Sequence, residues 1–370
     1  MTTPTTDDAG TAPAAPPSAP PSATPGRRRP GGGIGRYLLV RFLLIFPTIL
    51  ILVTTVFVMM RATGDPITAA LGGRLTADQL AERIHEAGYD RPIVVQYLEY
   101  LGGILRGDFG TTISDNRPVT EVLVTYGAAT LELAVYALVV AFAVGIPLGR
   151  LAAARRDTGV DATLRVSAVV AYATPVFFAG MLLKLVFSVW LGWLPVAGRA
   201  STGAEIQMQR SGADTGIYLV DAISTGDGAV VLDVLEHAVL PAVALGLLTA
   251  GVFLRLVRTN VIGTLTTVYV EAARSRGVAE RRLLRKHAWR PALVPIITVI
   301  GLQIALLLAG AVLTETTFEW KGLGFQLVQY LLARDFVAVQ GMVAMLAVIV
   351  AVTNFVVDVI AALVDPRVRY

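Results

Sequence analysis

Near its C-terminal end the sequence reads Val343-Ala344-Met345-Leu346-Ala347-Val348-Ile349-Val350-Ala351-Val352, an unbroken apolar run. Buried strands are about four to eight residues long, so this run is typical of a membrane-spanning helix. Of the 370 residues, 55% are hydrophobic and 16% are charged, against about 25% charged in an ordinary soluble protein. The sequence therefore predicts an all-α, polytopic membrane protein.

Working outward from this run, the hydrophobic pattern predicts six transmembrane helices, each near the ~20 residues that cross the hydrocarbon core. Their expected bounds are Tyr37 to Met60, Thr130 to Leu151, Val166 to Leu191, Ala238 to Leu256, Ala292 to Leu313 and Val337 to Val364. Pro47, Pro147 and Pro175 fall inside these spans and predict kinks rather than ends. Gly145 and Gly149, four residues apart, predict a close helix contact.

The distribution of charge predicts the orientation. With the N-terminus in the cytoplasm, the cytoplasmic segments and their flanks hold 20 of the 31 Lys and Arg but 7 of the 27 Asp and Glu. The net charge is then +13 inside and −8 outside, a positive-inside pattern. The basic pI of 9.4 is thus explained by membrane orientation, and nucleic-acid binding is not expected.

Three segments outside the spans differ from them in composition. Residues 1–33 are rich in Pro, Ala and Thr and predict a disordered cytoplasmic tail ahead of a transmembrane domain at 34–370. The first span is too long for a signal peptide, which is the competing interpretation. The outside loop at 61–129 predicts a small extracytoplasmic cap, whereas residues 192–236 look mostly irregular.

Helix-capping signals in the cap loop support this. Thr76 to Gln79 fits a capping box, and Gly88 stands where the C-terminal cap of that helix belongs. A second helix is expected to begin at Pro92 and to carry Ile93 and Tyr97 on one face.

The cytoplasmic loop at 257–291 has the most distinctive pattern. Tyr269 to Glu280 predicts a helix that ends at Gly277, followed by a second, short helix from Arg281 to Arg290. Basic pairs at i,i+4 on that helix need an acidic or polar partner, and anionic lipid would serve as well as protein. Lipid binding does not explain small residues before a breaking glycine, so the pattern favours a hairpin that docks in a groove of another protein.

Glu271-Ala272-Ala273 followed by Gly277 resembles the EAA loop of binding-protein-dependent ABC importer permeases. The surrounding motifs narrow the resemblance to the dipeptide, oligopeptide and nickel permeases, over about nine tenths of the chain. These motifs are Gly64-Asp65-Pro66, Asp90-Arg91-Pro92, Gln96-Tyr97, Gly107-Asp108-Phe109-Gly110, Gly145-Ile146-Pro147-Leu148-Gly149, Trp193-Leu194-Pro195, His287 with Pro295, Arg334-Asp335, Asn354, Asp358 and Asp365-Pro366-Arg367. Pro291, where the family pattern has Asn, departs from it, and the tail at 1–33 has no counterpart.

The resemblance implies a six-helix permease subunit of the bacterial cytoplasmic membrane with both termini in the cytoplasm. It implies a second homologous permease, two cytoplasmic ATPase subunits and an extracytoplasmic solute-binding protein as partners, besides membrane lipid. ATP and Mg would be bound by the ATPase subunits, so no cofactor is expected in this chain. The residues implied in ATPase coupling are Glu271, Ala272, Ala273, Gly277 and His287.

Other chemistry finds little support. Cysteine is absent, and His85, His237 and His287 fall in separate loops without a carboxylate at ligand spacing, so no metal site is expected. Gly31 to Gly35 lacks the Gly-Lys-Ser/Thr of a phosphate loop, and the spans hold no Gly-x-Ser-x-Gly or His-Glu-x-x-His. The chain is therefore predicted not to be an enzyme.

Polar residues within spans are the remaining functional candidates, because each is costly in lipid. Glu132, Gln303 and Asn354 are candidates for the translocation pathway, and Asp358 is expected to pair with a basic residue of the coupling loop. Lys184 is the strongest candidate for an ionisable residue near the middle of the membrane. It keeps an ion-coupled transporter as a weaker alternative function.

The expected function is ATP-driven import of short peptides. The acidic outer face tolerates the ammonium group of a peptide, but it would tolerate nickel equally. Few histidines and no cysteine favour the peptide. Nickel, glutathione or another small solute carried by the same mechanism remain the alternatives.

Overall fold

The computed structural model describes residues 34–364, apart from certain side chains in α1, α13 and the end of α15. The long helices are α1 (Ile34–Ala62), α5 (Val119–Ala154), α10 (Gly228–Leu265), α13 (Trp289–Phe318) and α15 (Phe336–Val364). The shorter ones are α2 (Pro66–Leu71), α3 (Ala77–Glu86), α4 (Ile93–Leu105), α6 (Gly159–Ala173), α7 (Val176–Leu183), α8 (Thr202–Ser211), α9 (Tyr218–Ser224), α11 (Val268–Ser275), α12 (Glu280–Arg282) and α14 (Leu323–Leu332), with π-helical turns η1 (Lys184–Trp190) and η2 (Leu283–Ala288). The predicted tail at 1–33 and Asp365 to Arg367 lie outside the described residues.

Among the described residues, four helices are long and apolar enough to cross a membrane. They are α1, α5, α10 and α15, and the bent pair of α6 with α7 and η1 would make a fifth span. At 30 residues α13 has sufficient length, but most side chains in its middle lie outside the described set. A multi-pass membrane protein is confirmed, and the count of six spans stays a prediction.

The third predicted span, Val166 to Leu191, is wrong as a single kinked helix. The chain bends by 104° between α6 and the unit formed by α7 and η1. Pro175 caps the new helix, and its ring forces Thr174 into an extended conformation with ψ of 124°. Beyond the bend, the ammonium group of Lys184 donates to the carbonyl of Thr317 in the last turn of α13, at 2.9 Å. Lys184 therefore satisfies a helix C-terminus rather than standing alone at mid-span.

The segment from Gly192 to Glu236, referred to below as the outer segment, is not mostly irregular, contrary to the prediction. It forms α8, α9 and the first turns of α10, whose buried side chains make a small core of Ala204, Met208, Ala222, Val230 and Val234. Ser201 caps α8 through Ala204 N, Gly212 ends it with φ of 76°, and Asp227 caps α10 through Ala229 N. Some of the polar residues that suggested a loop are therefore helix caps.

The cap segment from Arg61 to Ala129 has the predicted local structure. Thr76 and Gln79 form the capping box of α3, and Gly88 follows that helix with φ of 73°. Pro92 precedes α4 as expected. The loop before α5 is fixed to α15 by Asp335, whose carboxylate accepts hydrogen bonds from Ile113 N and Ser114 N at 2.7 Å and caps α15 through Ala338 N.

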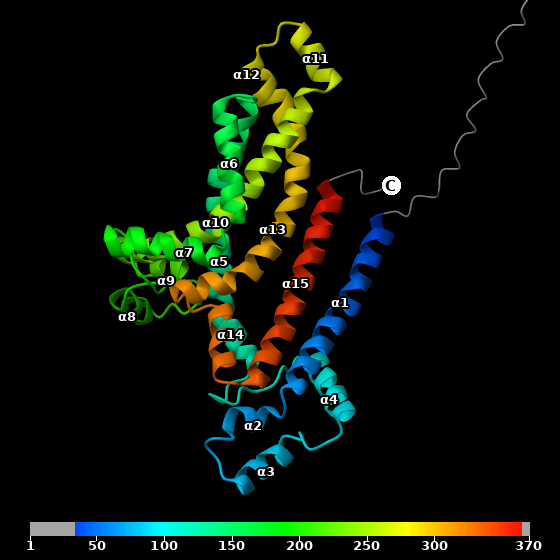
Figure 1. Cartoon of the computed structure of the whole chain (residues 1–370), viewed down its shortest axis with the longest axis vertical. Coiled ribbons are helices and arrows are strands. Elements are labelled where there is room, and N and C mark those ends of the chain that lie inside the picture. The colour runs from blue at the N-terminus through cyan, green and yellow to red at the C-terminus, as the bar shows by residue number, and fades with distance from the viewer. Residues whose placement is uncertain (1–33, 365–370) are drawn as a thin grey trace, which may run out of the picture.

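The molecule is elongated along its helices (Figure 1). The turn between α11 and α12 forms one end, beyond α6 and α10, and α2 and α3 form the opposite end beside α14 and α4. At one side of the bundle, α1 lies beside α15. The predicted cytoplasmic loop and the predicted extracytoplasmic cap thus lie at opposite poles.

Glycines hold α5 against α10 at the centre of the bundle. A Cβ on Gly145 would lie 2.7 Å from the carbonyl of Ala250, and one on Gly149 would lie 2.8 Å from the carbonyl of Leu254. Gly246 makes the reciprocal approach to α5, 2.7 Å from the carbonyl of Ala137. The predicted close contact at Gly145 and Gly149 is confirmed.

Replacing Gly149 with alanine is expected to destabilise the chain by about 1–3 kcal/mol, because the new methyl group overpacks this contact. Gly263, on the same α10, is the matched control, since a Cβ added there would have no atom within 4 Å. Gly263→Ala should be neutral or slightly stabilising, because alanine favours helix. The measurement is the apparent melting temperature of each full-length variant in detergent. Equal melting temperatures for the two variants would contradict the packing explanation.

Candidate functional site

The hairpin formed by residues 268–288 carries the predicted coupling residues and projects from one end of the molecule (Figure 1). Gly277 has φ of 81°, and its N–H donates to the carbonyl of Arg274 at 2.9 Å. Val278 N donates to the carbonyl of Ala273 at 3.2 Å. These two bonds form a Schellman motif, in which the residue after the helix must adopt a left-handed conformation. The predicted helix end at Gly277 is confirmed.

The inner side of the hairpin packs on the transmembrane helices. Val270, Leu283 and Ala288 are fully buried in a cluster with Val261 and Leu265 of α10. Ala273 and Val278, whose backbones are joined in the turn, pack against the same cluster. A displacement of the hairpin would therefore be transmitted directly to α10 and α13.

The outer side of the hairpin is exposed. Glu271, Ala272 and Gly277 face solvent, and so do two large apolar residues just before them. Val268 is 85% exposed and Tyr269 is 49% exposed. Exposed apolar side chains beside small residues on a protruding helix are typical of a protein contact. The sequence analysis did not identify Val268 and Tyr269, although their position directly before Glu271 could have indicated them.

Charged groups link the two arms of the hairpin. Arg274 Nε lies 2.5 Å from Glu280 Oε1, and this carboxylate raises the pKa of Arg274. A cavity of 450 Å³ between the hairpin and the C-terminal ends of α5 and α10 is lined by Arg156, Glu271, Arg274 and Glu280 among others. A second, purely basic groove of 560 Å³ is lined by Ala279, Arg281, Arg282, Arg285 and Lys286.

His287, like Ala273, is partly buried, whereas Glu271, Ala272 and Gly277 are exposed. The carbonyl of His287 lies 3.4 Å from the Tyr269 hydroxyl, whereas its buried Nδ1 has no hydrogen-bond partner among the described residues. The second arm is also not a separate helix, contrary to the prediction. From Glu280 the chain continues through α12 and η2 into α13 without an intervening loop, and Pro291 lies near the start of α13.

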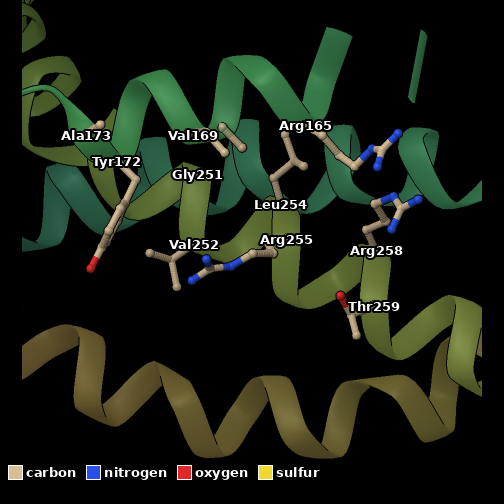
Figure 2. A pocket seen from close by; sticks show the side chains of 11 residues that line it. Arg165, Val169, Tyr172, Ala173, Gly251, Val252, Leu254, Arg255, Arg258 and Thr259 are labelled. Atoms are coloured by element: carbon tan, nitrogen blue, oxygen red, sulfur yellow. The ribbon is translucent and has the colours of Figure 1, made fainter. Parts of the chain in front are cut away.

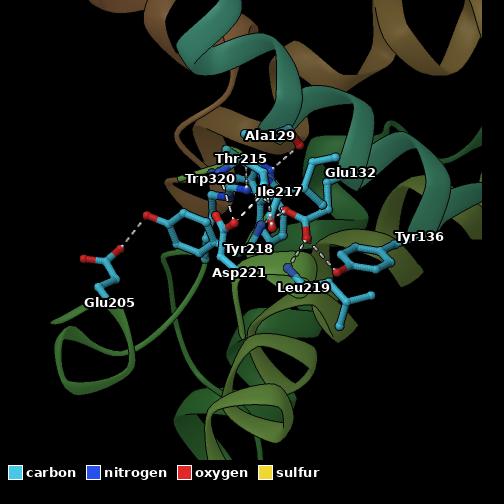
Figure 3. Close-up of polar contacts among 12 residues, drawn as sticks. Ala129, Glu132, Tyr136, Glu205, Thr215, Ile217, Tyr218, Leu219, Asp221 and Trp320 are labelled. Carbon is cyan, nitrogen blue, oxygen red and sulfur yellow. Dashed lines mark hydrogen bonds and ion pairs between the residues drawn. The ribbon is translucent and has the colours of Figure 1, made fainter. Parts of the chain in front are cut away.

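Glu132, the first predicted pathway residue, is enclosed in a hydrogen-bond network (Figure 3). Arg199 donates to its Oε2 at 2.5 Å, and the Tyr136 hydroxyl and Leu219 N each donate to its Oε1 at 2.8 Å. Tyr218 N adds a fourth bond at 3.3 Å. The side chains of Arg199 and Glu132 are 6% and 2% exposed.

Arg199 also ties the outer segment together. Its guanidinium donates to the carbonyl of Gly216 at 2.8 Å and lies 3.7 Å from the centre of the Tyr218 ring and 5.4 Å from that of Trp320. The pair therefore fixes the segment containing α8 and α9 onto α5. No sequence signal indicated Arg199, because it lies 67 residues from Glu132 and belongs to none of the motifs identified in the sequence.

The other predicted pathway residues belong to different helices. Gln303 of α13 is 7% exposed, and Asn354 of α15 is exposed. The side chains of Asp358 and Pro295 lie outside the described residues. The pathway assignment of Glu132, Gln303 and Asn354 stays a prediction. Among the residues that the structure describes, no cluster of His, Asp or Glu could hold a metal ion.

Comparison with known proteins matches both halves of the chain. The family model "Binding-protein-dependent transport system inner membrane component" matches residues 145–370. A second, "Binding-prot-dependent transport system membrane comp, N-term", matches residues 34–133.

Curated relatives align over nearly their whole length. The dipeptide transport system permease protein DppB of Escherichia coli K12 is 38% identical over 90% of this chain and 99% of its own. The di/tripeptide transport system permease protein DppB of Pseudomonas aeruginosa is 36% identical over 88% and 96%. The oligopeptide transport system permease protein AppB of Bacillus subtilis is 32% identical over 90% and 99%.

Among solved structures, a chain of the inward-facing MetNI methionine ABC transporter has the same fold. The TM-score is 0.50 at 17% sequence identity, over 66% of this chain and 97% of that chain.

Proposed function

Since this chain belongs to the family of binding-protein-dependent transport permeases of ABC importers, we propose that it is the membrane subunit through which such an importer carries short peptides. The observation that supports the proposal most is the 268–288 hairpin, in which Val268, Tyr269, Glu271 and Ala272 are exposed on α11 and the helix ends in a Schellman turn at Gly277. It offers a partner protein a protruding surface on which to dock.

In the proposed mechanism, two cytoplasmic ATPase subunits bind ATP and Mg. One of them also binds the hairpin of this chain, and the other binds the hairpin of a second, homologous permease. Closure of the ATPase pair would move each hairpin, and the buried contacts of Val270 and Leu283 would transmit that movement to α10 and α13. Helices packed without voids move as rigid bodies rather than deforming locally. A pathway between the two permeases would then alternate between the two faces of the membrane.

The proposed orientation places the hairpin in the cytoplasm of a bacterial cell and the α2–α4 cap outside. The described structure supports this, because the two segments lie at opposite poles of the bundle (Figure 1). With the predicted six spans, both termini would be cytoplasmic, and the cap would offer an extracytoplasmic binding protein its landing surface. Residues 1–33 would be an appendage to the transport domain at 34–370, with the cap at 61–129 and the coupling loop at 257–291.

The proposed substrate follows the relatives, whose names specify dipeptides, di/tripeptides and oligopeptides. A strain that lacks this chain should fail to grow when a dipeptide is the only source of a required amino acid. Growth should return when the intact chain is supplied, and the free amino acid should support both strains equally.

The same strains distinguish the alternative solutes. The deletion strain could grow normally on dipeptides and tripeptides but lose a nickel-dependent enzyme activity. That result would contradict peptide import and would indicate that the importer carries nickel. A glutathione importer would instead show loss of growth on glutathione alone as the sulfur source.

A further inference from the structure

A pocket of 260 Å³ lies between α6 and α10 (Figure 2). Its walls combine arginines with apolar side chains, namely Arg165, Val169 and Tyr172 of α6 and Val252, Arg255 and Arg258 of α10. The helices meet closely at its floor, because a Cβ on Gly251 would lie 2.9 Å from the carbonyl of Ala168.

The pocket carries more positive charge than its one carboxylate neutralises. Arg258 donates Nε and a terminal N–H to the two oxygens of the buried Asp161, at 2.6 and 2.7 Å. Arg165 Nε is 3.7 Å from the same carboxylate. Arg255 forms no ion pair with any residue in the described part of the chain, and its guanidinium lies 5.8 Å from the centre of the Tyr172 ring. The pocket therefore has three guanidinium groups and one nearby carboxylate, that of Asp161, whose two oxygens already accept hydrogen bonds from Arg258. The net charge of this group of side chains is +2.

The surroundings of the pocket are apolar and exposed. Val166, Val169 and Val170 of α6 are 62%, 64% and 58% exposed, and Tyr172 is 59% exposed. Arg255 lies at the C-terminal end of the predicted span from Ala238 to Leu256. In the proposed orientation, a cationic pocket with an apolar rim therefore stands at the inner surface of the membrane.

We propose that this pocket binds one anionic phospholipid of the inner leaflet. Its phosphate would lie on Arg255, whose side chain points away from Arg165 and Arg258 (Figure 2), and its acyl chain would lie along Val169, Val252 and the Tyr172 ring. Basic pockets between transmembrane helices on the cytoplasmic side suit such headgroups. A transported peptide fits less well, because its ammonium group would meet an excess of positive charge, and the carboxylate of Asp161 is already occupied by Arg258.

The test uses the full-length chain in a neutral detergent, titrated with dioleoyl phosphatidylglycerol or dioleoyl phosphatidylcholine and followed by native mass spectrometry. We expect one tightly retained phosphatidylglycerol, bound about fivefold or more tightly than phosphatidylcholine. Arg255→Gln should lower the phosphatidylglycerol affinity about fivefold, since each basic residue near a lipid phosphate contributes about that much.

Arg36→Gln is the matched control, because Arg36 is an exposed arginine on the same predicted membrane face but outside the pocket. It should change the affinity less than twofold. Val252→Trp should also weaken binding, by filling the apolar side without changing the charge. The last variant keeps the proposal testable if Arg255→Gln does not fold.

Three results would overturn the lipid site. They are equal affinity for the two lipids, equal losses in Arg36→Gln and Arg255→Gln, or displacement of phosphatidylglycerol by dialanine, which would make the pocket a solute site. The proposal rests on the proposed function only for its orientation. If the pocket binds phosphatidylglycerol but the chain supports no peptide uptake, only the proposal of peptide import is contradicted. Failure of the lipid site and failure of the proposed function can therefore be told apart.

Discussion

Gly277→Leu is expected to abolish transport while the protein still inserts in the membrane. The turn of the 268–288 hairpin requires a left-handed residue at this position, with φ of 81°. A side chain in that conformation costs about 1–2 kcal/mol. No atom lies within 4 Å of where the Cβ would be, so a steric clash would not explain a loss of function. The backbone would instead be driven out of the Schellman geometry, and the exposed edge at Glu271 and Ala272 would change direction.

The measurements are uptake of a labelled dipeptide and co-purification of the ATPase subunits, at equal membrane levels of the permease. We expect uptake to fall more than about tenfold and co-purification to be lost, because a misdirected docking edge loses its central contacts. Gly277→Asn is the control, since asparagine tolerates the left-handed region and should retain most activity. Wild-type uptake and co-purification in Gly277→Leu would show that the hairpin is not the docking site.

Charge reversal provides a second variant on the same surface. Glu271→Lys changes an exposed residue that is not required for the turn, so its effect would report the contact itself. Glu82→Lys, on the exposed face of α3 at the opposite pole, makes the same charge change away from the hairpin. Loss of uptake in the first and not in the second is the expected pattern.

Local signals in the sequence predicted the local features of the fold correctly. The capping box at Thr76 and Gln79, the left-handed turn at Gly277 and the helix contact at Gly145 and Gly149 each depend on residues within a few positions of one another. The apolar runs also indicated the membrane spans, because length and composition are sufficient for that inference.

Features that depend on tertiary context were not predictable in the same way. Pro175 was expected to kink one span, but whether a proline kinks or breaks a helix depends on what satisfies the freed backbone groups nearby. In this fold α7 turns away by 104°, and η1 beyond it meets the end of α13 through Lys184. The caps of α8 and α10 were visible as Ser201 and Asp227, yet the polar composition around them was interpreted as a loop.

Glu132 illustrates the same limit at the candidate site. A carboxylate in a span suggests a pathway role when its partner is unknown. In the structure its carboxylate accepts three hydrogen bonds from the outer segment, including one from the guanidinium of Arg199, and a fourth from Tyr136 of α5. A solute could reach this carboxylate only if that segment moved.

Arg199→Ala should therefore destabilise the chain strongly, by about 3–5 kcal/mol, because it leaves the buried carboxylate of Glu132 without its counter-charge. The effect should appear as a fall of several degrees in the melting temperature of the purified full-length protein, with earlier proteolysis between α8 and α9. Arg210→Ala, at an exposed arginine of α8, is the control and should have little effect.

The double variant Glu132→Gln/Arg199→Met separates a buried charge pair from simple packing. Removing both charges while keeping similar volume should recover most of the lost stability, since replacing a whole buried pair is far less harmful than removing one partner. Such recovery would give a large coupling energy between the two positions in a double-mutant cycle. If the double variant is instead as unstable as the sum of its single changes, the two residues act independently. The outer segment would then be held mainly by the core of Ala204, Met208 and Val234 rather than by the pair.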